Sequence, residues 1–367
     1  MSGSAFGRAF TLGVEEELVV VDPGTLALSH TGVEVLRAMQ VAPGAGSAHP
    51  DTYAALVEFA SPVCRSAGEG VAAIAALRAA ARQAGGTLLG AGIHPDGAFG
   101  DVVHVDEPRY HEIHAQLRGL LRRTPTCALH VHVGMPDAET AIHVCNDLRE
   151  WLPLLQALAA NSPFWHGVDS GLATSRAQLF RGYPRGDIPR AFRSFEDYEE
   201  SVGAVLAAGD LPDYTFLWWD VRPHPRLGTV EVRAMDAQSS LRTVTGLVGL
   251  IHGLARAAAE TPAASGAASG WSPREALMES SFRAARDGLG ATLLADGALR
   301  PVPEIARAAV ARARPFAREL GAEDALAEID RVVDETGGGA DRQRAAFARG
   351  GMRAVLELLA GETAADL

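Results

Sequence analysis

The sequence contains 367 residues, of which 47% are hydrophobic, so a globular fold with a large core is available to it. Its net charge of −12 argues against nucleic acid or an anionic membrane as the main partner. All 33 basic residues are arginine, which excludes a Walker-A lysine, a lysine Schiff base and a lysine general base.

The predicted elements of the first half alternate between strands and helices, without the rhythm of repeated βαβ units. We expect strands at residues 11–21, 55–60, 87–93 and 127–134. We expect helices at residues 69–83 and 137–160, the second with Asp137 as its N-cap. Residues 161–186 are rich in Gly, Pro, Asp and Arg, which predicts a loop.

In the second half, a hairpin is expected first, with strands at 220–222 and 229–235 joined by a turn at 223–228. The sequence after residue 243 is expected to be helical, with a small-residue linker at 261–270. Strands joined by hairpins and by long connecting segments, followed by helices, predict an α+β fold with a mainly antiparallel sheet. We expect one domain over residues 1–367, with the sheet and active-site motifs in 10–240 and a helical part in 241–367.

Cysteine usage and the N-terminus indicate a cytoplasmic protein. Cys64, Cys127 and Cys145 are odd in number and widely spaced, which fits neither a disulfide framework nor a zinc ribbon. Residues 1–10 have no apolar signal-peptide core, and no stretch has the length and apolarity of a membrane span. We therefore expect small-molecule substrates and neither a membrane nor a nucleic acid as partner, while the C-terminal helices offer a surface for a homo-oligomer.

Three consecutive glutamates lie in the first predicted strand. Because alternate side chains of a strand share a face, Glu15 and Glu17 point one way and Glu16 the other. Adjacent carboxylates repel each other and are rare in strands, so something must compensate for their charge. A solvated sheet edge would do so. The apolar run that follows favours a buried strand, in which a divalent cation neutralises Glu15 and Glu17.

Two other strands carry ligand-type side chains on one face. His130 and His132 share a face of the strand at 127–134, which is typical of a metal or phosphate site, although buried core histidines are the alternative. Glu231 and Arg233 share a face of a later strand. Glu231 could bind a metal and Arg233 a phosphate oxygen, or the two could form an ordinary surface pair.

Two further segments are weak candidates for site residues when they are considered without those strands. Glu58 lies between apolar residues and is a candidate ligand if the other acidic strands are. The loop that contains Asn161 and Ser175 has the composition of many substrate-binding loops, and equally of an ordinary surface loop. Together, hard oxygen ligands on one sheet face favour Mg²⁺ or Mn²⁺, and such ions with arginine forks can hold the triphosphate of ATP without lysine.

Several motifs together resemble the bacterial carboxylate–amine ligase family, the second type of glutamate–cysteine ligase. They cover roughly residues 10–240 in the order of the family. The motifs are Gly13-Val14-Glu15-Glu16-Glu17, Gly92-Ile93-His94-Pro95, Arg109-Tyr110, His130-Val131-His132-Val133-Gly134, Ala160-Asn161-Ser162-Pro163-Phe164-Trp165, Asp169-Ser170-Gly171-Leu172-Ala173-Thr174-Ser175-Arg176, Trp218-Trp219-Asp220-Val221-Arg222-Pro223 and Thr229-Val230-Glu231-Val232-Arg233.

The resemblance implies a glutamine-synthetase-like catalytic domain, in which a curved, mainly antiparallel sheet has helices on its outer face. It implies ATP-dependent joining of the γ-carboxylate of glutamate to the amine of cysteine through an acyl phosphate, with Mg²⁺ or Mn²⁺. By position it implies metal ligands at Glu15, Glu17, Glu58, His130 and Glu231. It further implies that His132 lies near the nucleotide, that Arg233 and Arg176 hold phosphate or developing charge, and that Arg222 holds a substrate carboxylate, while Glu16 points away.

Three other functions compete with glutamate–cysteine ligation. The same chemistry could use a different amino acid or amine as acceptor. A zinc hydrolase could be built on His130 and His132, with His94 recruited as a further ligand. A non-catalytic member could keep the fold and bind ligands without turnover.

Overall fold

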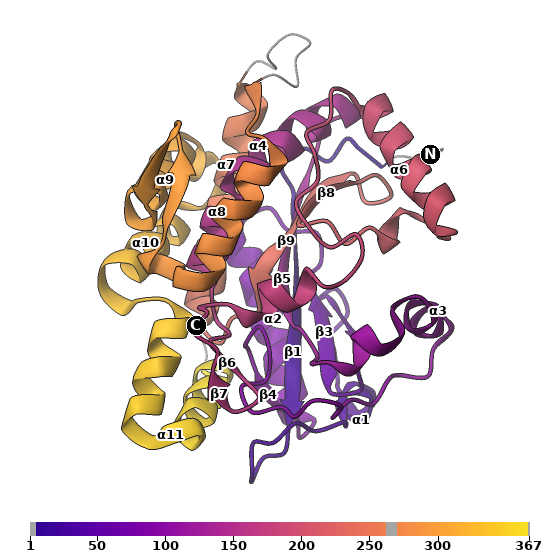
Figure 1. Ribbon diagram of the computed structural model, residues 1–367, viewed down its shortest axis with the longest axis vertical. Coiled ribbons are helices and arrows are strands. Elements are labelled where there is room, and N and C mark those ends of the chain that lie inside the picture. The colour runs from indigo at the N-terminus through magenta and orange to yellow at the C-terminus, as the bar shows by residue number, and fades with distance from the viewer. Residues whose placement is uncertain (1–4, 262–269, 366–367) are drawn as a thin grey trace.

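The computed structural model describes residues 5–261 and 270–365, and a seven-stranded sheet forms its centre (Figure 1). The spatial order is β2 (Ser47–Pro50), β3 (Leu56–Ala60), β1 (Leu12–Val21), β5 (Ala128–Gly134), β9 (Thr229–Asp236) and β8 (Val221–His224), and β4 (Thr87–Leu89) pairs with β1. Every pairing in this sheet is antiparallel. The predicted α+β class with a mainly antiparallel sheet is therefore confirmed.

Helices cover one face of the sheet in two layers. The inner layer consists of α2 (Ala67–Gln83), α4 (Ala138–Leu158) and α7 (Leu241–Glu260), which contact the sheet strands. Behind it lie α8 (Arg274–Asp287), α9 (Val302–Leu320) and α10 (Glu323–Arg331), which pack on α4 and α7. The last helix, α11 (Gly339–Ala364), bends at Gly350 and Gly351 and packs on α2 and β4. The expected helical C-terminal part thus supplies α7 of the inner layer and the helices that lie behind it (Figure 1).

The other helices are shorter or lie apart from these layers. In Figure 1, α3 (Pro108–Leu117) stands on the opposite side of the sheet from α11, and η1 (Arg118–Arg122) continues it. The remaining elements are α1 (Gly32–Ala38), α5 (Ser175–Phe180), α6 (Phe195–Gly209) and the short η2 (Tyr214–Phe216), η4 (Gly288–Gly290) and η5 (Val332–Thr336). None of the helices within residues 5–261 and 270–365 is long and apolar enough to cross a membrane.

Local sequence explains where the central elements begin and which way they face. The side chain of Ser66 accepts a hydrogen bond from the amide of Glu69 at the start of α2, and Asp137 caps α4 as predicted. Along β1, Val14 and Leu18 are fully buried on the helix-covered face. One hydrophobic core includes β1, α4, α7 and α9, so the sheet and the C-terminal helices share their interior.

Some elements differ from the sequence prediction. The strand expected at 87–93 ends at Leu89, and the region expected to be a loop, 161–186, contains β6 (Phe164–Trp165), β7 (Val168–Asp169) and α5. A hairpin of β10 (Thr292–Ala295) and β11 (Ala298–Pro301) interrupts the helical C-terminal part. Its strands are largely exposed, so no apolar alternation indicates them. Most of the linker predicted at 261–270 lies outside the described residues.

Candidate active site

Strand register brings the acidic and histidine side chains together on the face of the sheet that the helices leave open. Glu15 on β1 lies opposite His130 on β5, and Glu17 lies opposite Glu58 on β3. Farther along the same face, His132 lies opposite Glu231 on β9, which in turn lies opposite Arg222 on β8. Seven side chains from five strands therefore form one surface because the register of the antiparallel sheet places them side by side.

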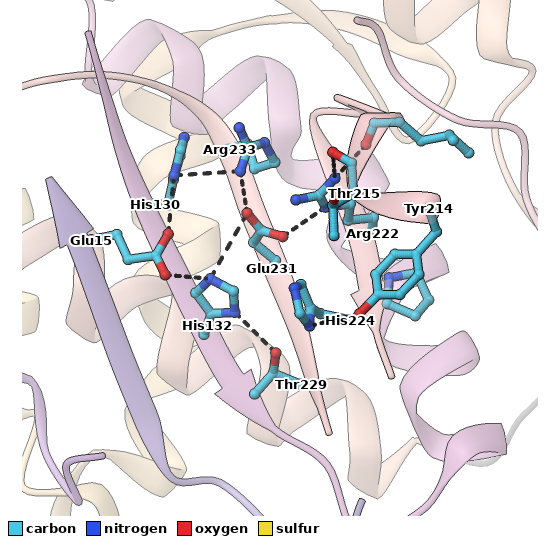
Figure 2. Close-up of polar contacts among 12 residues, drawn as sticks. Glu15, His130, His132, Tyr214, Thr215, Arg222, His224, Thr229, Glu231 and Arg233 are labelled. Atoms are coloured by element: carbon cyan, nitrogen blue, oxygen red, sulfur yellow. Dashed lines mark hydrogen bonds and ion pairs between the residues drawn. The ribbon is translucent and has the colours of Figure 1, made fainter. Parts of the chain in front are cut away.

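Two overlapping groups of these side chains have the spacing of cation ligands. Glu15, His132 and Glu231 form one group, and Glu15, Glu58 and His130 form the other. Within each group the potential ligand atoms all lie within 4.8 Å of one another. Glu15 belongs to both, since its Oε2 is 3.4 Å from Nδ1 of His130 and its Oε1 is 3.4 Å from Nε2 of His132 (Figure 2). The arrangement suits two cations that share one carboxylate.

The two histidines have free nitrogen atoms that a cation would satisfy. Nε2 of His130 and Nε2 of His132 are buried and have no hydrogen-bond partner. On the other side of the His132 ring, Nδ1 lies 2.9 Å from Oγ1 of Thr229. Although burial opposes the charged form, the charges of Glu15 and Glu231 raise the pKa of His132, so a cation at Nε2 would displace a proton. A hydrogen bond donated by Nδ1 to the Thr229 hydroxyl would then fix the tautomer that presents Nε2 to the metal. The donor set therefore fits a divalent cation.

Three arginines border the acidic groups. Nε of Arg222 donates to Oε2 of Glu231 at 2.7 Å, and Nη1 of Arg233 donates to Oε1 of the same carboxylate. Nη1 of Arg233 also lies 3.4 Å from Nδ1 of His130 (Figure 2). Arg176, from α5, donates through Nη2 to the backbone carbonyl of Arg233 at 3.3 Å. Positive charge thus lies directly beside the candidate cation ligands, as binding a polyanion requires.

Burial and neighbouring carboxylates raise the pKa values of two acids in the site. Burial, with the nearby Asp51, raises the pKa of Glu17 to about 8, against the opposing influence of Arg176 and Arg233. Burial and the charges of Glu15 and Glu17 also raise the pKa of Glu58 well above its usual range. Such shifts mark a site where negative charge is concentrated without enough positive charge to balance it, which is what a cation would supply.

The neutral form of His130 is favoured, as a metal ligand needs. Burial and then the charge of Arg233 lower the pKa of His130 to about 4. By contrast, burial opposes the charged form of Glu15, but the two neighbouring histidines outweigh it and hold the pKa of this carboxyl well below its usual range. At neutral pH the group therefore offers a carboxylate and an unprotonated imidazole together.

These side chains line a cavity of about 300 Å³. From the sequence prediction it contains Glu15, Glu17, Glu58, His130, His132, Arg176, Arg222, Glu231 and Arg233. Glu17 differs from the other acids, since its Oε2 accepts a hydrogen bond from the amide of Ala128 at 2.7 Å and it belongs to neither ligand group described above. The remaining predicted ligands lie together in the two groups.

The cavity also contains residues to which sequence reasoning gave no role. Asp51 follows β2 and faces Glu17 and Arg233, and burial raises its pKa. Arg109 and Tyr110 belong to α3, whose helix spans one side of the cavity: Tyr110 donates to the carbonyl of Pro50 at 2.6 Å and Arg109 to Oγ1 of Thr215 at 3.2 Å. The Arg109-Tyr110 motif was the one available signal for this wall, whereas Asp51 follows a strand of four residues and has no periodic pattern around it.

Two residues predicted to bind substrate do not line the cavity. Asn161 is almost fully buried, and its side-chain amide donates to the carbonyls of Gly90 and Ala237 and accepts from Gln343. Ser175 is also buried and donates to Oγ of Ser170 at 2.8 Å. Their polar groups are used inside the protein, so the prediction of substrate contact is corrected to a structural role in the wall.

The positions of Glu16 and His94 bear on the choice between the ligase and the zinc-hydrolase interpretations. Glu16 lies on the helix-covered face, where it forms a buried ion pair with Arg78 of α2. His94, the further ligand that a zinc hydrolase would need, lies 2.9 Å from the carbonyl of Leu26 through Nε2. It belongs to neither of the ligand groups found among the described residues.

Known proteins are similar to this chain over almost its whole length. The profile of glutamate-cysteine ligase family 2 matches residues 11–358. A Rubrobacter xylanophilus protein, provisionally named glutamate–cysteine ligase 2-3, is 38% identical over 366 residues, which cover 97% of this chain and 97% of the relative. The glutamate–cysteine ligase of Haloferax volcanii is 37% identical over 292 residues, covering 78% of this chain and 81% of the relative.

A solved structure has a similar fold at low sequence identity. The glutamate–cysteine ligase of Francisella tularensis, in complex with AMP, matches with a TM-score of 0.73 and 12% identity. The match covers 98% of this chain and 89% of that structure. At this identity the likeness concerns the fold.

Proposed function

Because this chain belongs to glutamate–cysteine ligase family 2, and is thus an ATP-dependent ligase, we propose that it joins the γ-carboxylate of L-glutamate to the amine of L-cysteine. The observation that carries the proposal is the pair of ligand groups sharing Glu15, with Arg176 and Arg233 beside them in one cavity. We further propose that the sheet is of the glutamine-synthetase type. Residues 1–367 would act as one ligase domain on small molecules in the cytoplasm.

Mg²⁺, or Mn²⁺ in its place, would be held by Glu15, Glu58 and His130 and by Glu15, His132 and Glu231. Such a cation supplies positive charge to phosphate oxygens when it is bound. His132 would then lie both at a cation and beside the nucleotide. Glu17 would act as an additional acidic ligand from β1.

The arginines of the cavity would bind and orient the reacting phosphate. Nε of Arg176 and Nε of Arg233 are buried without a hydrogen-bond partner, so each guanidinium has a donor left for a phosphate oxygen. Arg222 is fixed by Glu231, and it would present its remaining charge to the carboxylate of a substrate. Arginine provides every one of these contacts because the sequence contains no lysine.

The reaction would proceed in two steps. An oxygen of the glutamate γ-carboxylate attacks the γ-phosphorus of ATP, ADP leaves, and an acyl phosphate forms. The amine nitrogen of the acceptor then attacks the acyl carbon, and phosphate leaves as the amide forms. Glu17 and Asp51 are the carboxylates of the cavity that stand outside both ligand groups. Because Glu17 is assigned above as an additional cation ligand, the Oδ atoms of Asp51 would take the proton that the ammonium group of the acceptor must lose.

A coupled assay of ADP release over a panel of acids and amines tests this function. We expect release that requires glutamate, an amine and Mg²⁺ together, and formation of glutamyl hydroxamate when hydroxylamine replaces the amine. Activity with another amino acid or amine in place of cysteine would identify the alternative acceptor within the same chemistry. Release of AMP instead of ADP would contradict the acyl phosphate, and ATP-independent hydrolysis with bound zinc would contradict ligation.

A further inference from the structure

A carboxylate behind the cavity, that of Asp236, is buried in the interior at the end of β9. Asp236 has an exposed fraction of 1%. Its Oδ2 accepts from the amide of Asn161 at 2.9 Å and from Oγ of Ser162 at 2.7 Å, and its Oδ1 accepts from Oγ1 of Thr174 at 2.8 Å. All three donors belong to the segment that leads into α5.

Arg176 in α5 is the cation that faces this carboxylate. Its Nη1 lies 3.9 Å from Oδ1 of Asp236, and within the described part of the chain no other cation is found within 4.0 Å of that carboxylate. The amide of Arg176 also donates to Oγ of Ser162, the hydroxyl that donates to Asp236. Asp236 therefore contacts both the guanidinium of Arg176 and the hydroxyl that fixes its backbone.

The cavity face of Arg176 remains available. Its Nη2 donates to the carbonyl of Arg233, its guanidinium lies over the ring of Phe180 at 5.4 Å, and Nε has no partner. The side chain is thus held on three sides, by Asp236, the Arg233 carbonyl and Phe180. What remains open is the side that lines the cavity.

A glycine makes room for this arrangement. A Cβ atom on Gly92 would lie 2.5 Å from Cγ of Asp236 and 2.8 Å from Oγ of Ser162, distances that real Cβ atoms do not reach. Gly92 begins one of the sequence motifs, Gly92-Ile93-His94-Pro95, for which the proposed reaction provides no use. The close approach of Asp236 to Gly92 is a physical reason for the glycine at the start of that motif.

Burying a carboxylate costs several kcal/mol unless hydrogen bonds and a counter-charge offset it. Burial accordingly raises the pKa of Asp236, and Arg176 is the foremost of the influences that oppose this rise. The three hydrogen bonds offset part of this cost, and the guanidinium of Arg176 is the counter-charge. The carboxylate therefore links the segment that leads into α5 to the guanidinium of Arg176.

We infer that Asp236 is a positioning residue, which sets the orientation of Arg176 so that this guanidinium binds the phosphates of the nucleotide. The inference rests on the proposed function, in which Arg176 contacts phosphate. Asp236 itself touches no substrate. It acts on Arg176, directly through the guanidinium and indirectly through the hydroxyl of Ser162 that accepts from the amide of Arg176.

A double-mutant cycle on binding tests the inference. The probe is Mg²⁺ with the non-hydrolysable ATP analogue adenylyl imidodiphosphate, measured by calorimetry on the full chain. We expect Asp236→Asn and Arg176→Lys each to weaken binding by roughly 10- to 100-fold, the range that misplacement of a binding group produces. The double variant should bind no more weakly than Arg176→Lys alone, because Asp236 would act only through Arg176.

A second perturbation leaves every charge in place. Gly92→Ala introduces a methyl group against Asp236 and Ser162, and we expect it to weaken binding of the analogue in the same direction as Asp236→Asn. This variant decides the matter if Asp236→Asn fails to fold. As a matched control, Asp147→Asn removes a buried carboxylate of α4 that pairs with Arg312 at 2.6 Å, away from the cavity, and should lower thermal stability without changing affinity.

The outcomes separate the inference from the proposed function. Multiplication of the two single effects in the double variant would overturn the inference, as would unchanged binding in Asp236→Asn or Gly92→Ala. A chain that binds the analogue but releases no ADP with glutamate and hydroxylamine would refute the proposed function, while the binding cycle would still decide on Asp236. A chain that binds no nucleotide would overturn both.

Discussion

Glu15 and Glu16 are neighbours on β1, yet their carboxylates lie on opposite faces of the sheet and have different partners. Glu15 faces the cavity and lies 3.4 Å from an imidazole nitrogen of each of His130 and His132. Glu16 is fully buried against α2 and forms an ion pair with Arg78. The two-residue period of the strand therefore assigns one glutamate to the site and the next to the core.

Substitution of Glu15 should affect the cation requirement more than substitution of any other acidic ligand. Glu15 belongs to both ligand groups, whereas Glu58 belongs to one. We expect Glu15→Gln to lower kcat by about 10²–10³-fold, the cost of losing one electrostatic group in an active site. ADP release measured against Mg²⁺ concentration should shift further for Glu15→Gln than for Glu58→Gln, and equal shifts would argue against a shared ligand.

Substitution of Glu16 should act on stability instead. Glu16→Gln leaves the guanidinium of Arg78 buried without its carboxylate, although the carbonyls of Gln238 and Ser239 still accept from it. We expect the free energy of unfolding to fall by about 3–5 kcal/mol, as for other broken buried ion pairs. Denaturant titration measures this loss. Replacing Arg78 with Met in the same chain should restore part of it, and a changed Mg²⁺ requirement in Glu16→Gln would contradict the assignment.

Asp51→Asn should separate the two kinds of acceptor. An alkyl ammonium group must lose a proton before it attacks, whereas hydroxylamine is mostly unprotonated at neutral pH. Loss of a general base commonly costs about 10²–10⁴-fold in rate. We expect a loss of this size with cysteine and a much smaller one with hydroxylamine in the ADP assay. Equal losses with both acceptors would show that Asp51 supports binding and not proton removal.

Acid should destabilise the fold through His252 of α7. This side chain is fully buried, its Nε2 lies 2.8 Å from the carbonyl of Phe10, and burial lowers its pKa to about 4. An unfolded histidine titrates near 6.5, so between pH 6.5 and 4 the unfolded chain binds more protons and stability falls as the pH falls. The loss from this group should be about 2 kcal/mol between pH 7.5 and 5.

The variant His252→Gln tests that assignment. Glutamine keeps a donor for the Phe10 carbonyl but has no titration in this range. Unfolding free energies of both proteins at the two pH values would show a smaller pH dependence in the variant. The same pH dependence in both proteins would assign the acid sensitivity to other groups, such as His130 and His224, whose pKa values burial also lowers to about 4.

The strands that carry the site could be predicted from the sequence because alternation is a local property. β1, β5 and β9 differ from the expected ranges by only one residue at an end, and their inward and outward faces are those that the period predicts. The β10–β11 hairpin was missed because its strands are exposed. Its turn, Asp296-Gly297, has positive φ at both residues and is a recognised hairpin signal that could have revealed it.

The non-local parts of the site could not be predicted in the same way. Asn161 has the composition and position of a binding residue, but its side-chain amide is bonded to Gly90, Ala237 and Gln343, which only the fold brings near. Asp236 lies beyond the alternating motif of its strand, and its partners come from another loop. A short polar side chain gives no local sign of whether its groups are satisfied inside the protein or free to bind a ligand.

The bent helix α11 has a consequence for the order in which the protein can form during synthesis. Gln343 donates to the backbone and side chain of Asn161, 182 residues earlier in the chain, and Arg344 pairs with Asp169 at 2.9 Å. Ser162, which lies between Asn161 and Asp169, accepts a hydrogen bond from the amide of Arg176. A ribosome delivers every strand of the central sheet well before it delivers this helix, so the nascent chain can pair its sheet while the wall behind Arg176 still lacks its support.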